Sequence, residues 1–446
     1  MSPKPSDVVV TGIGVLASTG IGVDAFWSSL RDGKSGIVYL DQRDDGAKPS
    51  GDWRNGPLAG CWIGGPINGF DASQFVRPRK ALKVMGRELQ TAFAASQMAM
   101  AQAGLPDAVE SGSISRDKVA TIFGSQMLYG PASELLDAVK NSVDENLICE
   151  LSRFGSAAMR DIMPLWMLKY LPNMAACHVG IAVGATGPNN TIVAGDVSAT
   201  SALMESIGAL DRGIASIVVS GATGSRIDET YLVYRGDWPT PTAKGDTSSY
   251  SRPHSIDADG VVGAEAASSL VLETRASAHE RSVKPLAVVA GYASRFALPA
   301  FDEPSTNGNK PRGSSSAIKL AIQGALASSG LDPKDIGMVV SHGIGDPVRD
   351  AAERNALLSM LPHVPICIPV ATTGHSGAAT AGVALVAGVL SLIHQTIPAT
   401  PSYAGTHPAV SHLCNMQPRP LKKNAVIVLS HNSHGAANAI VFKSAS

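Results

Sequence analysis

The chain has 446 residues, of which 44% are hydrophobic and 16% are charged, and 36 basic residues nearly balance 37 acidic ones. This composition excludes a disordered chain. The formal net charge of −1 provides no general field that would attract nucleic acid. The cysteines are few, odd in number and widely spaced, which excludes a small fold held together by disulfides. They are Cys61, Cys149, Cys177, Cys367 and Cys414.

Two stretches of the sequence bear on location, and neither predicts a membrane protein. The first residues lack the long apolar run of a signal peptide. The longest apolar run of the second half, residues 381–393, is too short to cross a bilayer and predicts a buried helix. We therefore expect a cytoplasmic protein without a membrane partner.

The first half of the chain alternates between strand-like and helix-like segments, which we place by apolar periodicity and by turn residues. In chain order these are strand 8–10, helix 26–31, a loop or insertion at 41–69, and a strong helix from the basic residues 77–83 through residue 101. There follow strand 119–123, helices 134–151 and 157–170, strand 191–193, helix 198–212, strand 215–220, strand 267–272 and helix 275–281.

The second half repeats this alternation. Its predicted elements are strand 286–291, helix 317–329, strand 338–341, helix 348–360, strand 366–369, helix 378–394 and strand 425–429. Strands that alternate with helices predict an α/β protein with mostly parallel sheets. Two such runs predict two similar βαβ-rich halves that share a core, residues 1–274 and 275–446.

A strand-to-helix junction at residues 187–198 is the first candidate site. The strand ends near a glycine and the helix begins within two residues, so Asp196 lies at the helix N-terminus and Ser198 follows it. Free N–H groups and the helix dipole favour an anion there, and a nucleophile at such an elbow is activated. The alternative is that Asp196 simply caps the helix.

Two further junctions each carry a histidine between small residues. His342 follows strand 338–341, and His375 precedes the apolar helix. The carboxyl ends of strands are where open α/β sheets build their sites. Neutral imidazole N–H groups at these places can polarise a carbonyl or stabilise an oxyanion. The alternative for each histidine is a structural role in a loop.

Other patterns are less specific. His431 and His434 are three residues apart, but no third ligand accompanies them, and we expect no metal. The glycine-rich turns fit neither a P-loop nor a dinucleotide fingerprint. A basic cluster is either a solvated helix start or a docking surface for an acidic partner. It comprises Arg77, Arg79, Lys80 and Lys83.

Several motifs together resemble the elongating, thiolase-fold type of β-ketoacyl-acyl-carrier-protein synthase. The resemblance spans nearly the whole chain. The matching segments are residues 9–15, 22–27, 187–192, 250–253, 259–267, 342–343, 373–375 and 432–435.

The resemblance implies a thiolase-like fold with two similar halves in an α-β-α-β-α layering. It implies an elbow cysteine that accepts an acyl chain, and two histidines that promote decarboxylation of a malonyl-carrier thioester. Acyl carrier protein supplies the phosphopantetheine arm, so no cofactor of the chain's own is implied, and the protein is a homodimer or a heterodimer with an active ketosynthase. By the same resemblance the basic cluster contacts the carrier, and the substrate-binding positions are Ser198, Asp346, Val370, Thr373 and His434.

The sequence departs from this family at decisive places. Asp196 stands where the cysteine belongs, and a carboxylate cannot form the usual thioester. Val370 occupies the position of a lysine, and Ile344 and Asp346 replace two threonines. The closing loop is shortened and lacks its phenylalanines, with His434 near the position of one of them.

Three functions follow as hypotheses. The first is a condensation-incompetent subunit, similar to a chain length factor, that partners an active ketosynthase. The second is a decarboxylase or hydrolase that acts on a malonyl- or acyl-carrier thioester through His342 and His375, with Asp196 as a general base for hydrolysis. The third is a carrier-binding module without catalysis.

Overall fold

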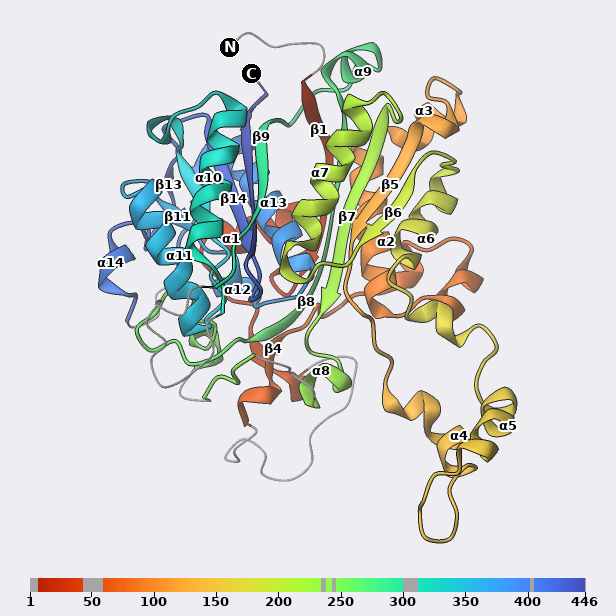
Figure 1. Ribbon diagram of the computed structural model, residues 1–446. Coiled ribbons are helices and arrows are strands. Elements are labelled where there is room, and N and C mark those ends of the chain that lie inside the picture. The colour runs from red at the N-terminus through yellow and green to blue at the C-terminus, as the bar shows by residue number, and fades with distance from the viewer. Residues whose placement is uncertain are drawn as a thin grey trace.

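The computed structural model describes residues 7–42, 59–233, 238–242, 246–299, 312–401 and 405–445. Helices and strands alternate in five layers, α-β-α-β-α, as Figure 1 shows. This confirms the thiolase-like fold class that the motifs predict. Most of the predicted loop at 41–69 lies outside the described residues. Within them, no helix combines the length and the apolarity that a membrane crossing requires.

Thirteen of the described strands form one sheet, in which two runs have the same order of parallel and antiparallel neighbours, and two further short strands pair with each other. The first run is β1 (Val8–Ala17), β8 (Gly263–Thr274), β7 (Ile217–Ser225), β5 (Val119–Gly124) and β6 (Asn189–Ile192). The second run is β9 (Ala287–Phe296), β15 (Ala436–Ser444), β14 (Ala425–His431), β10 (Met338–Val340) and β11 (Ile366–Cys367).

The two runs meet at their first strands. β1 and β9 are antiparallel and paired only at Val9 with Val288 and at Val10 with Ala287. β8 ends at Thr274, so the proposed boundary between residues 274 and 275 falls at the end of the first run. Residues 1–274 and 275–446 as the two halves remain a proposal.

Two helices lie between the sheet halves. These are α7 (Ser198–Asp211) and α13 (Ala379–Ile393). α13 is buried on every side, which matches its apolar composition, and the prediction of a buried helix at 381–393 is confirmed. The outer layers contain α2 (Arg87–Gln102), α3 (Leu105–Glu110) and α6 (Met174–Val183) on one side, and α10 (Ser315–Ser329) and α11 (Pro347–Met360) on the other.

Close packing of α2 on β1 depends on glycine. A Cβ atom at Gly14 would lie 1.8 Å from the carbonyl oxygen of Ala95, which is far inside van der Waals contact. The strand and the helix backbones can therefore approach only without a side chain at this position. This close contact packs α2 of the outer layer against the first half of the sheet.

Two predicted helices are wrong. Residues 134–151 form only the short α4 (Leu136–Lys140), because the Asp144 carboxylate accepts the backbone N–H groups of Asn146 and Ile148 and closes a turn instead. The helix predicted at 157–170 is α5 (Leu151–Asp161), which ends before Pro164. Proline has no N–H group with which to continue it.

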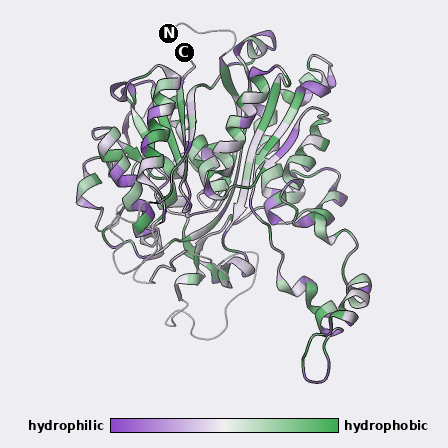
Figure 2. Ribbon diagram, viewed as in Figure 1, coloured by the Kyte–Doolittle hydropathy of each residue, from purple (hydrophilic) through white to green (hydrophobic). Residues whose placement is uncertain are grey.

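α4 and α5 project from the body as an arm, which we define as residues 131–170 (Figure 1). Figure 2 shows apolar residues along this arm, away from the main core. Leu147, Leu151 and Met159 are each more than four-fifths exposed. Exposed apolar surface of this extent is typical of an interaction surface.

Shorter elements complete the described fold. They are α1 (Val23–Arg31), α8 (Glu229–Val233), α9 (Arg275–Glu280), α12 (Val370–Thr373), α14 (Pro408–Ser411), β2 (Gly20–Ile21), β3 (Val38–Tyr39), β4 (Ile63–Gly65), β12 (Thr396–Ile397) and β13 (Arg419–Pro420).

Candidate active site

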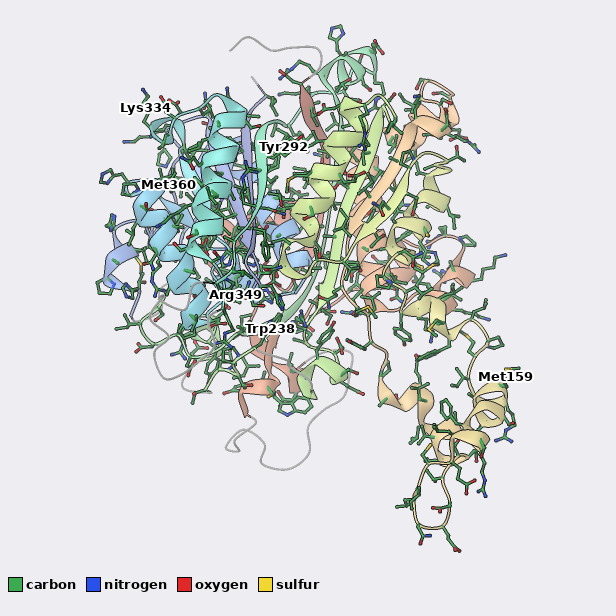
Figure 3. The ribbon with its side chains drawn as sticks, viewed as in Figure 1. Met159, Trp238, Tyr292, Lys334, Arg349 and Met360 are labelled. Atoms are coloured by element: carbon green, nitrogen blue, oxygen red, sulfur yellow. The ribbon has the colours of Figure 1, made fainter. Side chains whose placement is uncertain are left out.

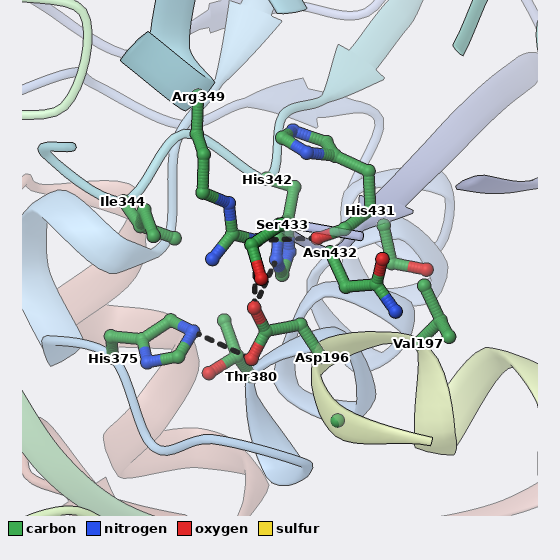
Figure 4. A network of polar contacts seen from close by, with 12 residues as sticks. Asp196, Val197, His342, Ile344, Arg349, His375, Thr380, His431, Asn432 and Ser433 are labelled. Carbon is green, nitrogen blue, oxygen red and sulfur yellow. Dashed lines mark hydrogen bonds and ion pairs between the residues drawn. The ribbon is translucent and has the colours of Figure 1, made fainter. Parts of the chain in front are cut away.

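The site lies where strands of both halves end. Asp196 sits in the 3-10 turn Gly195–Val197, between β6 and α7. His342 follows β10, His375 follows α12, and His431 is the last residue of β14. Figure 4 shows His342, His375 and Arg349 directed toward the Asp196 carboxylate. The structure thus brings together the three predicted catalytic positions, Asp196, His342 and His375.

Both carboxylate oxygens of Asp196 have partners. Oδ1 lies 3.2 Å from His375 Nε2. Oδ2 accepts a hydrogen bond of 2.7 Å from the Arg349 guanidinium and lies 3.9 Å from His342 Nε2. Asp196 is only 4% exposed, and both histidines are fully buried. The carboxylate therefore stands between the two imidazoles and is shielded from water.

The charge state of this carboxylate is set by its neighbours. Burial by itself raises the pKa of Asp196, but the charge of Arg349, with smaller contributions from His375 and His342, outweighs it and holds the pKa well below its ordinary value. Burial lowers the pKa of His375 to about 4, although Asp196 opposes the shift. At neutral pH the site thus contains a carboxylate, a guanidinium and a neutral His375.

Arg349 is a central residue that sequence reasoning missed. It comes from α11, is 1% exposed, and also donates a hydrogen bond of 2.5 Å to the carbonyl oxygen of His431. Figure 3 shows its side chain in the interior of the molecule. Asp196 and Arg349 come from different halves of the sheet, so their ion pair joins the two halves at the site.

The same face of α11 carries two buried carboxylates. Asp350 accepts backbone N–H groups of His254, Ile344 and Gly345. This contact fixes the loop that follows His342. Ile344, one of the departures from the family pattern, is buried within that loop.

Glu353 lies one turn further along α11. It accepts the backbone N–H of His342 at 3.0 Å, and His431 Nε2 lies 3.2 Å from its other oxygen. Burial raises the pKa of Glu353, but the hydrogen bond from His431 and the nearby imidazoles outweigh burial and lower the pKa to about 2. Glu353 therefore holds both histidines as a buried carboxylate.

An aromatic and cationic stack covers His375 on another side. The Trp238 ring packs edge-on against His375, with centroids 4.4 Å apart. The Arg226 guanidinium lies 3.9 Å from the Trp238 centroid and 4.5 Å from that of Tyr231. These contacts bury the cation between two rings.

Four predicted substrate-binding residues make contacts within the fold. The Ser198 hydroxyl donates to the Gly195 carbonyl oxygen and accepts the Ala194 N–H, so it closes the elbow turn. The Asp346 carboxylate caps α11 at the Val348 N–H and pairs with Arg312. Val370 is buried in α12, and the hydroxyl of Thr373 donates to the carbonyl oxygen of Pro369. The substrate-binding role of these four residues stays a prediction.

His434 is exposed, and its Nδ1 lies 3.2 Å from the Ser433 hydroxyl. It does not join the buried group around Asp196. The predicted carrier-contact residues are exposed as well, with three of them on the 3-10 helix Arg79–Val84. They are Arg77, Arg79, Lys80 and Lys83, and their role as a docking surface stays a prediction.

The ligand atoms of Asp196, His342 and His375 all lie within 4.8 Å of one another, a spacing that metal-ligating side chains can have. However, the carboxylate already binds the Arg349 guanidinium. A cation supplied by the chain itself thus balances the charge of Asp196. The absence of a metal remains a prediction.

The sequence does contain the signal for the α11 residues. Arg349, Asp350 and Glu353 lie one position and one turn apart, which places them on one face of a helix. A charged face on a predicted helix usually faces solvent. Only the tertiary structure shows that this face is buried against the loop of His342.

Comparisons with known proteins agree with this architecture. The family described as "Beta-ketoacyl synthase, N-terminal domain" matches residues 5–278, and "Beta-ketoacyl synthase, C-terminal domain" matches residues 286–404. A Streptomyces halstedii protein described as a polyketide beta-ketoacyl synthase 2 is 27% identical over 98% of this chain and 97% of its own. A 3-oxoacyl-[acyl-carrier-protein] synthase 2 from Synechocystis is 26% identical over 94% of this chain and 92% of its own.

Solved structures share the fold. The ishigamide ketosynthase/chain length factor has a TM-score of 0.78 at 19% identity and covers 98% of this chain and 99% of its own. A beta-ketoacyl synthase from Burkholderia phymatum has a TM-score of 0.80 at 20% identity, with the same coverage. Because the family matches extend over most of the sequence, this chain belongs to the beta-ketoacyl synthase family.

Proposed function

We propose that this chain is a condensation-incompetent ketosynthase-fold subunit of fatty acid or polyketide biosynthesis that partners an active ketosynthase. The observation that carries the proposal is the Asp196 carboxylate at the elbow, ion-paired with Arg349 at 2.7 Å. Condensation by this family requires a nucleophile that accepts the acyl chain as a thioester. An ionised carboxylate held by a guanidinium does not supply one.

The arm and the edge of the sheet support a protein partner. β6 is the last strand of the sheet and pairs with β5 alone among the described strands. The arm precedes α6 and β6 in the chain and exposes Leu151 and Met159. An open strand edge and exposed apolar side chains each favour contact with a second subunit. The relatives named above agree with a role in carrier-bound acyl chemistry.

The first experiment tests both parts of the proposal. The pure chain, incubated with acyl-carrier and malonyl-carrier protein, is expected to form no β-ketoacyl product. Co-expressed with a ketosynthase that has the elbow cysteine, it is expected to co-purify in a one-to-one complex. Condensation by the chain alone, or a chain that never associates with such a partner, would contradict the proposal.

A variant in the arm tests whether its exposed apolar residues contact the partner subunit. L151E/M159E places two charges on exposed apolar positions and is expected to weaken the complex at least about tenfold, because the charges would have to be desolvated. The matched control is L320E, at a residue of α10 that is 44% exposed and away from the arm. Equal complex formation by the two variants would exclude the arm as the contact.

A decarboxylase that uses His342 and His375 is the second candidate, since both histidines are retained and lie on either side of the Asp196 carboxylate. Its test is to incubate the chain with malonyl-carrier protein and to look for acetyl-carrier protein. A carrier-binding module is the third candidate. Charge reversal at Arg79 and Lys83 is then expected to weaken carrier binding, whereas unchanged binding would leave the basic cluster as a solvated helix start.

A further inference from the structure

The Arg349 side chain is buried beside the Asp196 carboxylate, which lies between the two histidines. One guanidinium nitrogen, Nη2, donates both to the Asp196 carboxylate and to the carbonyl oxygen of His431. Arg349 ranks among the largest fully buried side chains of the described residues. The whole side chain and its charge therefore lie in the interior of the site.

The contacts of the histidines show why a substrate carbonyl cannot reach them in this arrangement. To polarise a thioester carbonyl, His342 and His375 must each direct a ring N–H at the substrate oxygen. Here His375 Nε2 faces Asp196 Oδ1 at 3.2 Å, and its Nδ1 accepts the N–H of Gly377 at 3.4 Å. Nδ1 of His375 is thus occupied by the backbone, and Nε2 lies close to Asp196 although it makes no hydrogen bond there.

His342 is the complementary case. Its two ring nitrogens are buried and have no hydrogen-bond partner, and Nε2 is directed toward Asp196 Oδ2 at 3.9 Å. A buried imidazole without a partner is costly. A donor in this state is suited to a carbonyl or carboxylate oxygen at the place where the Asp196 carboxylate now lies.

Resting on the proposed function, we propose that Arg349 is an autoinhibitory positioning residue. It holds the Asp196 carboxylate between His342 and His375, where a malonyl thioester would otherwise bind. Two residues thus prevent decarboxylation: Asp196 occupies the substrate position, and Arg349 holds it there. His342 and His375 retain the donor set for the reaction.

The reaction that the open site would catalyse is decarboxylation of a malonyl-carrier thioester. The bond between the carboxylate carbon and the α-carbon breaks and carbon dioxide leaves. The electron pair passes to the thioester oxygen as an enolate, which His342 and His375 stabilise. A proton from water then yields the acetyl-carrier thioester.

The experiment compares D196Q with D196Q/R349A in single-turnover assays with malonyl-carrier protein. D196Q removes the carboxylate but leaves the guanidinium in place, and its rate is the reference against which the effect of R349A is measured. D196Q/R349A is expected to form acetyl-carrier protein at least about tenfold faster than D196Q. Adding H375A is expected to abolish the gain. The matched control, D196Q/R354A, removes an arginine of the same helix that does not contact Asp196.

Equal rates for D196Q and D196Q/R349A, including two negligible rates, would overturn the inference. Because R349A leaves space in the interior, access is measured separately with a cysteine probe. Alkylation of D196C/R349A by iodoacetamide is expected to be at least about tenfold faster than that of D196C, and equal rates would also overturn it. Wild type that forms acetyl-carrier protein as fast as D196Q/R349A would overturn the inference as well. Condensation by the wild-type chain would contradict the proposed function instead, so the two failures are distinguishable.

Discussion

The Arg349 guanidinium binds the Asp196 carboxylate at 2.7 Å, across the two halves of the sheet. Removing one partner of a buried ion pair leaves the other as an uncompensated charge. We expect R349M to lower the free energy of unfolding by about 3–5 kcal/mol. D196N/R349M, which removes both charges, should cost clearly less.

Denaturant unfolding of the single and double variants checks this prediction. R354M, in the same helix, removes an arginine that interacts with Asp350 and Glu353 rather than with Asp196, and as the control it should cost less than R349M. If the cost of D196N/R349M equals the sum of the single costs, the two side chains are not energetically coupled.

His375 makes stability depend on pH. Its pKa is about 4 in the folded protein, below the ordinary value of 6.5. Between these values the unfolded chain binds a proton that the folded chain does not, so His375 makes stability fall as pH falls from 6.5 to 4. H375Q should reduce the slope of stability against pH by up to about 1.4 kcal/mol per pH unit in this window. Parallel stability curves for the variant and wild type would contradict it.

Glu88 should have the opposite effect. It is buried at the start of α2, and burial, with the nearby carboxylate of Asp228, raises its pKa to about 8. The folded chain then retains a proton that the unfolded chain releases near pH 4.5, so Glu88 makes stability fall as pH rises from 4.5 to 8. We expect E88Q to be more stable than wild type by about 1–3 kcal/mol at pH 8 and similar to it at pH 4. Thermal or denaturant unfolding at the two pH values measures the difference.

Asp350 is expected to be essential for the loop after His342. Its carboxylate satisfies the buried N–H groups of His254, Ile344 and Gly345. Each unsatisfied buried group costs about 1–3 kcal/mol, so D350A should lose at least about 3 kcal/mol of stability. D350N keeps one acceptor oxygen and should fall between D350A and wild type. A D350A protein as stable as wild type would show that water replaces the carboxylate.

Much of this arrangement can be predicted from the sequence, because strand-to-helix junctions have strong local signals. The apolar run at 381–393 and the glycine-flanked histidines fix the buried helix and two of the strand ends. The arm, residues 131–170, could not be predicted, since its helices are interrupted by the turn at Asp144 and by Pro164. Arg349 could not be predicted either, because its burial depends on a contact with Asp196, 153 positions away in the chain.

The position of α13 between the sheet halves has a consequence for synthesis on the ribosome. This helix packs against β7 and β8 of the first half and against β14 of the second. While residues 1–274 are being made, the inner face of β8 has no cover, because its covering helix spans Ala379–Ile393. The first half therefore emerges with an exposed apolar surface, through which it can aggregate or bind a chaperone. Folding can be completed only after α13 has left the exit tunnel.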